Sequence, residues 1–504
     1  MLNAMLRSGL VCSGLLCSGL LCAALPGVAT PAFAQGRDNV TLCQTLEPPI
    51  LDPTGGAAAA IREIAYDNIF ETLVAFNGAG KLEPRLAERW SISPDGRVYT
   101  FSLRKGVTFH DGAPFSAKDV IFSFERARAP DAKNTQKWIF APIERMDAPD
   151  ETTLVITLKS EAGDFLDGLA WADATIFSER SVGKAATEPV GTGPYAFVSW
   201  ARGDRVVLKR YPGYWGPKPA IETARFRFIT DPQAQIAALQ AGDCDAHTNI
   251  GAPEAVPVLK ANPNLAVSIG RTEGETILAM NNAKPPFNNV KVRQAIAMAI
   301  DRNLVNAGAL SGFGTPIGSH FSPNHPAYLD LTGLVKPDVK AAKALLAEAG
   351  YKDGFSAILR LPPPAYARRS GEIIAAMLKE IGITLTIEPV EWPQWLEKVY
   401  RNKDYDLSIV AHVEPLDINI YARDGYYFGY HSEAVKAAVA LSKSGKTEAE
   451  RFKALQDAQR LIAQDQVNVF LFMLPKITVS NVKLKGMWVN WPIPANPLAP
   501  LRWE

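Results

Sequence analysis

Helix-like and strand-like patterns alternate between residues 292 and 410, and this alternation constrains the fold of the chain more than any other feature. Apolar residues at helical spacing lead up to Gly350 and again up to Gly382, where glycine favours the end of a helix. A period-two pattern follows at residues 383–387, and a further strand pattern covers residues 405–410. Because alternating strands and helices build βαβ units, we predict a mixed α/β protein with a partly parallel sheet.

The N-terminal half shows the same mixture of patterns. Residues 97–109 alternate aromatic and polar side chains around Lys105-Gly106, which predicts a β-hairpin. Ser116 and Asp119 form a helix-capping pattern, and we expect this helix to end before Pro130. Further strands are expected at residues 154–158, 205–209 and 224–229, and a further helix at residues 233–241.

Residues 1–34 have the features of a secretory signal peptide. Arg7 provides the positive charge, residues 10–25 form a short apolar region, and Ala32-Phe33-Ala34 is a small-residue cleavage pattern. The alternative, a membrane anchor, is disfavoured because the apolar run is broken by serine and glycine and is shorter than about 20 residues. We therefore predict cleavage after Ala34 and a soluble, periplasmic product.

The charge balance argues against binding to nucleic acid or to anionic lipid. The 504 residues include 53 Lys and Arg and 52 Asp and Glu, which gives a net charge of +1. Loss of Arg7 with the leader leaves no net charge, so we expect no electrostatic attraction to polyanions. With 47% hydrophobic and 21% charged residues, the composition is that of a globular chain with a sizeable core and not of a disordered one.

Two cysteines, Cys43 and Cys244, remain once the leader is removed. In an oxidising compartment they form either one disulfide or two free buried thiols, and the sequence leaves both alternatives open. Neither belongs to a CxxC motif, so we expect no structural zinc site.

Motifs of catalysis and of cofactor binding are missing from the sequence. The chain has no GxSxG, HExxH, Walker A or EF-hand motif. Residues 191–196 approximate GxGxxA, but Pro194 lies inside the motif and a strand-like stretch follows, so we predict a tight turn and no dinucleotide site. His320 and His325 are five residues apart with Pro323 between them, which does not match a helical pair of metal ligands. We therefore expect no enzyme activity, no cofactor and no metal.

A long block of motifs covers residues 82–120 and includes LEPRLAERW, SPDG and FHDG. Together with GTGPY at 191–195, RYPGYW at 210–215, LQAGDCD at 239–245 and MNN at 280–282, this block resembles the family 5 extracellular solute-binding proteins. These are the dipeptide, oligopeptide and nickel receptors of ABC importers.

The resemblance implies a two-lobed fold of the type II periplasmic binding protein class, with an extra inserted α/β domain. The two lobes of such a receptor close on the ligand by a hinge. The expected division is a signal peptide at 1–34, lobe one at 35–75, 190–278 and 473–504, an inserted domain at 76–189, and lobe two at 279–472.

The resemblance also implies where ligand contacts are expected. The stretch after Leu51-Asp52-Pro53 contacts the ligand backbone in relatives, and here it holds the small residues Gly56, Ala57 and Ala59, whose alternative role is a helix start packed on its neighbour. In lobe two, the expected contacts are Trp392, Tyr366, Arg368 and Arg369. The two arginines match a region that approaches a ligand carboxylate, for which Arg is suited, and the alternative is a charged helix face in solvent.

The turn at residues 411–419 departs from the pattern of the peptide-binding relatives. Those proteins place an acid in a turn that contains a tryptophan, whereas here Ala411 and His412 are followed by Glu414 and Asp417 without that tryptophan. Either Glu414 or Asp417 inherits the role of pairing a ligand ammonium, since an unpaired buried charge is costly.

The function that the resemblance implies is capture of a peptide or peptide-like solute and its delivery to the ABC permease in the inner membrane. We expect the protein to be a monomer and to release its ligand unchanged. The alternatives are a receptor for a non-peptide solute or a nickel chelate and, in a different class, a secreted hydrolase that uses a carboxylate pair in the same cleft.

Overall fold

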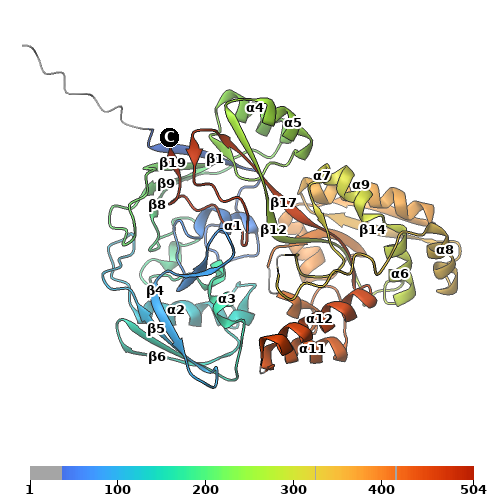
Figure 1. Cartoon of the computed structure of the whole chain (residues 1–504), viewed down its shortest axis with the longest axis horizontal. Coiled ribbons are helices and arrows are strands. Elements are labelled where there is room, and N and C mark those ends of the chain that lie inside the picture. The colour runs from blue at the N-terminus through green and yellow to red at the C-terminus, as the bar shows by residue number, and fades with distance from the viewer. Residues whose placement is uncertain (1–36, 324, 415–416, 446) are drawn as a thin grey trace, which may run out of the picture. The chain divides into compact units, whose positions relative to one another are not determined.

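Two long antiparallel strands, β12 (Leu265–Met280) and β17 (Asn468–Asn481), run side by side through the computed structural model of the chain (Figure 1). The structure describes residues 37–323, 325–414, 417–445 and 447–504. The expected signal peptide at 1–34 and its cleavage site lie outside the described residues, and the account that follows is of residues 38–504.

The main sheet has the strand order β15-β14-β16-β12-β17-β11-β1-β10-β9-β8, and β13 pairs with β17 as an eleventh strand. Strands β1 and β10 are parallel, as are β14 and β15, whereas β12 is antiparallel to both of its neighbours. These pairings confirm the predicted mixed α/β class with a partly parallel sheet. The other strands of this sheet are β1 (Asn39–Gln44), β8 (Tyr195–Ala201), β9 (Arg205–Arg210), β10 (Thr223–Phe228), β11 (Ala246–His247), β13 (Thr315–Pro316), β14 (Phe355–Leu361), β15 (Ile383–Pro389) and β16 (Leu407–His412).

A separate antiparallel sheet has the order β4-β5-β7-β6 and shares its hydrophobic core with α2 and α3. Its strands are β4 (Ala87–Ile92), β5 (Val98–Leu103), β6 (Ile143–Asp150) and β7 (Thr153–Leu158), and two small sheets pair β2 (Val74–Phe76) with β3 (Leu82–Pro84) and β18 (Leu484–Lys485) with β19 (Arg502–Trp503). The hairpin predicted at 97–109 is wrong. Strand β5 pairs with β4 and β7, and the alternate residues of β7 are buried apolar partners. Residues after Gly106 make a bridge between Thr108 and Pro114.

Helices surround these sheets at the places where capping residues predict them. The Ser116 and Asp119 pattern forms a capping box at the start of α2, and Gly242 ends α4 in the left-handed conformation. The pattern at 292–304 is split into α6 and α7, because the Asp301 carboxylate accepts hydrogen bonds from the first amides of α7. The α-helices are α1 (Ala59–Ala65), α2 (Ala117–Arg128), α3 (Phe165–Leu169), α4 (Pro232–Ala241), α5 (Val256–Ala261), α6 (Val290–Ala299), α7 (Arg302–Leu310), α8 (Val339–Glu348), α9 (Ala365–Glu380), α10 (Trp392–Trp395), α11 (Glu433–Ser444) and α12 (Glu448–Gln464).

Short 3-10 helices and one π-helical turn complete the elements. The 3-10 helices are η1 (Lys137–Ile139), η2 (Ala172–Ala174), η3 (Val182–Lys184), η4 (Pro253–Ala255) and η6 (Asp417–Tyr421), and the π-helical turn is η5 (Leu396–Arg401). Among the described residues, no helix combines the length and the apolar character that a membrane crossing requires.

Two close contacts decide how the two cysteines are paired and what the glycine motif at 191–196 forms. Cys43 in β1 and Cys244 after α4 form a disulfide with a Cα–Cα distance of 5.7 Å, so of the two open alternatives the chain has the bridge. A side-chain carbon on Gly191 would lie 2.0 Å from the Ile69 carbonyl oxygen, and β8 begins at Tyr195. The glycine motif is therefore a tight turn that enters a strand, as predicted, with no helix N-terminus to hold a pyrophosphate.

Candidate ligand-binding site

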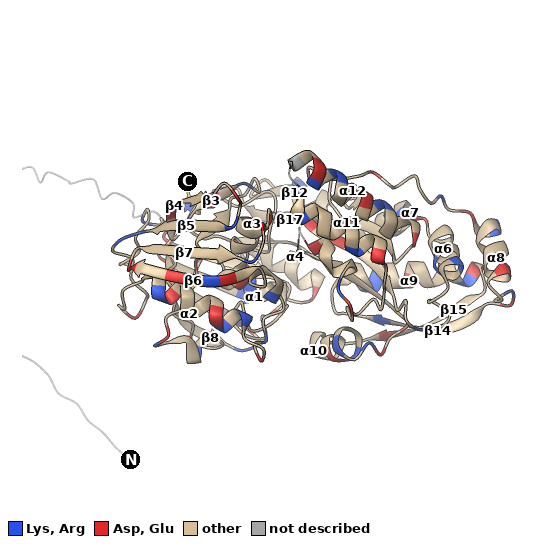
Figure 2. Cartoon of the chain, turned by 90° about the horizontal axis from the view of Figure 1, so that it is seen from below, with Lys and Arg blue, Asp and Glu red and all other residues tan. Residues whose placement is uncertain are grey.

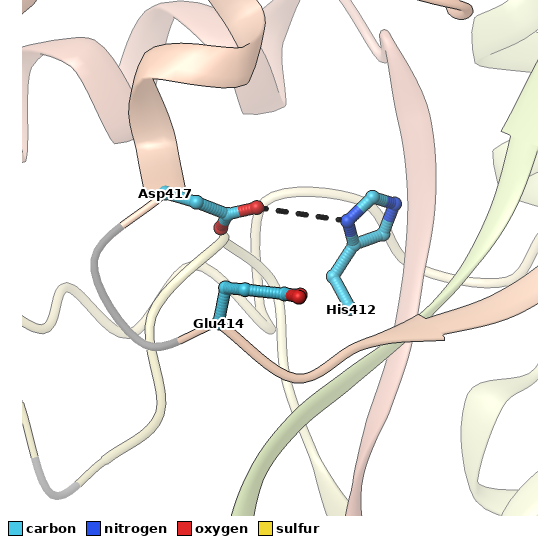
Figure 3. A group of neighbouring side chains, drawn as sticks. All are labelled: His412, Glu414 and Asp417. Atoms are coloured by element: carbon cyan, nitrogen blue, oxygen red, sulfur yellow. Dashed lines mark ion pairs between the residues drawn. The ribbon is translucent and has the colours of Figure 1, made fainter. Parts of the chain in front are cut away.

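The end of β16 and the turn that follows it bring His412, Glu414 and Asp417 together (Figure 3). Strand β16 is held on one side by β12, where Glu275 lies directly opposite His412. Asp417 opens the 3-10 helix η6. The sequence prediction had named all three residues of this turn, and the structure places one donor atom of each within 4.8 Å of the others.

The Asp417 carboxylate lies close to two histidines. Its carboxylate oxygens lie 3.2 Å from His320 Nε2 and 3.7 Å from His412 Nδ1. His320 Nδ1 in turn lies 2.6 Å from Glu275 Oε1, and these four side chains are almost entirely buried. The group therefore contains two carboxylates and two imidazoles that neutralise one another when both histidines are protonated.

The pKa values in this group follow from that arrangement. Burial acts to lower the pKa of His320, but the Glu275 and Asp417 carboxylates outweigh it and raise this pKa to about 10. Burial acts to raise the pKa of Asp417, but hydrogen bonds from His320 and His412 hold it well below its usual range. Burial also acts to lower the pKa of His412, and the surrounding carboxylates, Asp417 first, raise it. Asp417 is therefore an ionised internal counter-ion.

Glu414 lies beside His412 and also contacts or faces residues that come from distant parts of the chain. Gln136 Nε2 donates a hydrogen bond to Glu414 Oε1 at 3.2 Å. Arg62 in α1 makes a two-pronged pair with Asp173, with Nη2 and Oδ2 at 2.9 Å, and both side chains are almost inaccessible to solvent. Burial and the nearby Asp417 raise the pKa of Glu414, while Arg62 opposes this rise.

Aromatic rings form a wall beside the turn. The Tyr427 hydroxyl lies 2.9 Å from His412 Nε2, and the two rings are nearly parallel. Tyr426 and Phe428 pack against the same histidine. His412 therefore has a hydrogen-bond partner at Nε2 and an ion-pair partner at Nδ1.

The remaining residues named from the sequence divide into two sets. Tyr366 touches the turn, since its hydroxyl accepts a hydrogen bond from the Ala411 amide at 2.9 Å, and the Ala57 carbonyl accepts one from Arg62 at 3.1 Å. Gly56 and Ala59 precede Arg62 by a few residues. Among the described residues, neither has an interaction with the turn.

The second set consists of side chains engaged elsewhere. Arg369 makes two hydrogen bonds of 2.9 Å with the Glu254 carboxylate, and Arg368 lies 3.6 Å from Glu391. Trp392 packs edge-on against Trp395. Two cavities also lie away from the turn, one of about 610 Å³ that includes Arg302 and Tyr328 and one of about 230 Å³ beside Thr272 and Pro475.

Sequence reasoning missed Arg62, Gln136, Asp173 and Glu275, and it considered His320 only as one of a pair of metal ligands, which it excluded. His320 lies in a loop, and it is buried at the centre of the ionic group. These residues come from five separate elements or loops, so no spacing rule could have joined them. The one local signal was the excess of acids in the 411–419 turn.

Comparison with known proteins adds to this geometry. The family described as bacterial extracellular solute-binding proteins, family 5 Middle, matches residues 81–423. The chain belongs to this family. The proteins of family 5 are periplasmic solute-binding proteins that serve ABC importers, and they are binding proteins, not enzymes.

Individual relatives bind different solutes according to their names. The chain is 31% identical to the dipeptide-binding protein of Escherichia coli (strain K12) over 366 residues, which cover 66% of this chain and 68% of the relative. It is also 31% identical to heme-binding protein A of Haemophilus influenzae, over 69% of this chain and 70% of the relative. The periplasmic binding protein DppA from Helicobacter pylori, solved in complex with the peptide STSA, superposes with a TM-score of 0.87 at 27% identity, over 93% of this chain and 98% of that one. This family 5 chain therefore has the two-lobed architecture that the motifs implied.

Figure 2 shows that basic and acidic residues both occur along β6, α11 and α12. This mixture agrees with the balance of charges in the chain after residue 34.

Proposed function

We propose that this family 5 protein captures a peptide or peptide-like solute between its lobes and delivers it unchanged to an ABC permease in the inner membrane. The observation that carries the proposal is the group around Glu414. Glu414 at the end of β16 meets Gln136 and the Arg62–Asp173 pair, which belong to segments more than 200 residues earlier. Buried charged groups drawn from such distant segments are typical of a ligand site between two lobes.

The backbone beside this group supports binding of an extended ligand. Strand β16 is in register with β12 up to His412, but its register with β14 ends at Ser408. The Ala411 amide donates to the Tyr366 hydroxyl. A ligand strand along the outer edge of residues 410–412 would replace this hydroxyl with one of its own carbonyl oxygens as the acceptor. A dipeptide-binding relative at 31% identity and a neighbour solved with a tetrapeptide support the same ligand class.

We also propose the division into a lobe one, an inserted domain at 76–189 and a lobe two that the motifs implied. The separate sheet β4-β5-β7-β6 lies inside the proposed insertion, and the strands β14, β15 and β16 lie inside the proposed lobe two. The proposed partners are the solute and the permease, and the receptor acts as a monomer after export to the periplasm.

Mass spectrometry of the protein purified without denaturation from periplasm tests the proposal. The intact complex and the small molecules released on unfolding are compared, because a closed receptor retains its cargo. We expect a series of short peptides or peptide-like compounds, each recovered intact. Recovery of cleaved products after added peptide is incubated with the protein would instead support the hydrolase alternative and contradict the receptor.

A second candidate is a receptor for a non-peptide solute such as a metal chelate. It is favoured by the three donor atoms of His412, Glu414 and Asp417 within 4.8 Å and by the heme-binding relative. In this candidate, affinity requires metal and falls in the variant with His320, His325 and His412 all changed to Ala. Elemental analysis of the native complex without stoichiometric metal, together with bound peptide, would exclude it.

A further inference from the structure

An open cavity of about 610 Å³ lies within the proposed lobe two. It is formed by the start of α7, by β13 and by the loop that precedes α8. Its volume falls within the range of sites that hold small molecules. Apolar and aromatic side chains form part of its wall, and they are Ile300, Pro316, Tyr328, Val335 and Pro337. The cavity therefore offers an apolar surface to the body of a small ligand.

Arg302 lines this cavity with a guanidinium group that is only partly hydrogen-bonded. Its Nη1 donates to the Thr332 carbonyl oxygen at 2.7 Å. Its Nε is buried without a hydrogen-bond partner, and Nη2 has no partner among the described residues. Nε and Nη2 form one edge of the guanidinium, where two parallel N–H bonds match the two oxygens of a carboxylate. The edge that suits a carboxylate is therefore the one that the protein leaves unpaired.

The two acids that line the cavity are engaged with backbone amides of their own segments. Asp301 caps α7 and accepts hydrogen bonds from its first amides at 2.9 Å and 3.3 Å. Asp330 accepts hydrogen bonds from the amide and the hydroxyl of Thr332 at 2.9 Å and 2.7 Å. Burial lowers the pKa of Arg302 although both carboxylates oppose this shift. The guanidinium has thus lost water without gaining a carboxylate partner in the part of the chain that the structure describes.

We propose that this cavity is a second ligand site, which takes a small carboxylate with an apolar body and binds the carboxylate through Arg302. Lys336 lines the same cavity without an ion pair among the described residues, so it adds a second positive charge. The site goes beyond the proposed capture of a solute between the lobes. None of its lining residues belongs to the turn at 411–419 or to the ionic group around that turn.

Three probes with the same apolar body and different head groups test the proposal, namely hexanoate, hexan-1-ol and hexylammonium. Each is titrated into the full protein stripped of its cargo, and binding is followed by saturation-transfer difference nuclear magnetic resonance, which detects weak ligands of large proteins. We expect hexanoate to bind at least about tenfold more tightly than hexan-1-ol, because only hexanoate makes charged hydrogen bonds. Hexylammonium is expected to bind most weakly. Undetectable binding of hexanoate, or binding no tighter than that of the other two probes, would overturn the proposal.

Variants of Arg302 place the bound carboxylate. Arg302→Met is expected to weaken hexanoate binding about tenfold or more and to leave binding of hexan-1-ol within about twofold of wild type. Arg302→Lys keeps the charge but lacks the two parallel donors, so we expect an intermediate affinity. The matched control is Arg145→Met, which removes the same charge from an exposed side chain on β6. Wild-type affinity for hexanoate in Arg302→Met would show that the carboxylate binds elsewhere and would overturn the proposal.

Lys336→Met keeps the test decisive if replacement of Arg302 prevents folding. Arg302 also supports the Thr332 carbonyl, so circular dichroism checks that each variant is folded. Lys336 is exposed, and its replacement is expected to leave the fold intact. We expect Lys336→Met to weaken hexanoate binding about threefold at low salt and to have no effect on hexan-1-ol. An unchanged affinity of Lys336→Met for hexanoate would contradict the assignment of the carboxylate to this cavity.

Discussion

At the scale of single residues, buried charges in this protein are organised in matched groups. His320 between Glu275 and Asp417 is the centre of one group, and Arg62 with Asp173 is a second. A buried charge is tolerated only where its partners replace the water it has lost. The pairing also separates two acids three residues apart, since Asp417 lies against His320 and His412 whereas Glu414 accepts a hydrogen bond from Gln136.

Stability that depends on His320 is expected to decrease as the pH rises. Its pKa is raised from 6.5 to about 10 in the folded state, so its contribution to the free energy of unfolding is fully present below pH 6.5 and is lost as the pH rises through about 10. We expect the difference in unfolding free energy between wild type and His320→Gln to be larger at pH 6 than at pH 9, measured by urea denaturation. A difference that is constant over this range, or an imidazole that titrates near pH 6.5 by nuclear magnetic resonance, would contradict the assignment.

At the scale of elements, the pairing of β12 with β17 becomes irregular partway along the two strands. Their register shifts between Arg271 and Glu275, where three residues of β12 face only Leu474. Just before this shift, the Trp491 amide donates to the Arg271 carbonyl at 2.7 Å. Lys476 from β17 donates to the Trp488 carbonyl at 2.7 Å. The C-terminal segment 488–491 therefore clamps the strands on one side of an irregular stretch, and we expect bending to concentrate at that stretch.

Gly270 makes this clamp possible. A side-chain carbon at this position would lie 1.8 Å from the Val489 carbonyl oxygen, so Gly270→Ala forces the C-terminal segment away. We expect a loss of about 1–3 kcal/mol in the free energy of unfolding, as for an overpacked interior site, measured by urea denaturation. The control Gly333→Ala has open space around the added carbon and is expected to stay within about 0.5 kcal/mol of wild type. Equal stabilities of the two variants would show that the segment is not clamped at Gly270.

The elements also show what the sequence predicts well and why the rest escapes it. Helices α2 and α4 were predicted from their caps, because capping is a contact between residues three or four apart. The hairpin at 97–109 was wrong and strand β14 was not predicted, because strand pairing depends on partners far away in sequence. The site follows the same rule. The turn at 411–419 was named from the family resemblance and remains a prediction as a ligand site, whereas Arg62 and Gln136 could not be found beside it without the fold.

At the scale of the whole molecule, polar side-chain contacts outside the main sheet connect the proposed lobe two with the proposed lobe one and inserted domain. Gln136 meets Glu414, Lys443 lies 3.7 Å from Asp164, and Arg369 makes its two-pronged pair with Glu254. The two ion pairs are partly exposed, so each contributes little alone. A ligand that touches both lobes adds to these contacts, which is how a binding protein couples capture to closure.

The Arg369–Glu254 pair offers a test of this coupling that does not depend on the identity of the ligand. Arg369→Met removes a contact between α9 and η4, where the two side chains are 33% and 46% exposed. The pair is worth about 0.2–1 kcal/mol, so we expect binding of the most strongly retained peptide to weaken by up to about fivefold and the unliganded protein to have a larger radius of gyration by small-angle X-ray scattering. Arg401→Met is the matched control, because its partner Glu397 lies in the same helical turn. The two effects should shrink together in 0.5 M salt, where the ionic screening length is only about 4 Å and exposed pairs lose most of their strength. An Arg369→Met protein with wild-type affinity and wild-type scattering at low salt would show that this pair plays no part in closure, and that the ligand contacts alone bring the lobes together.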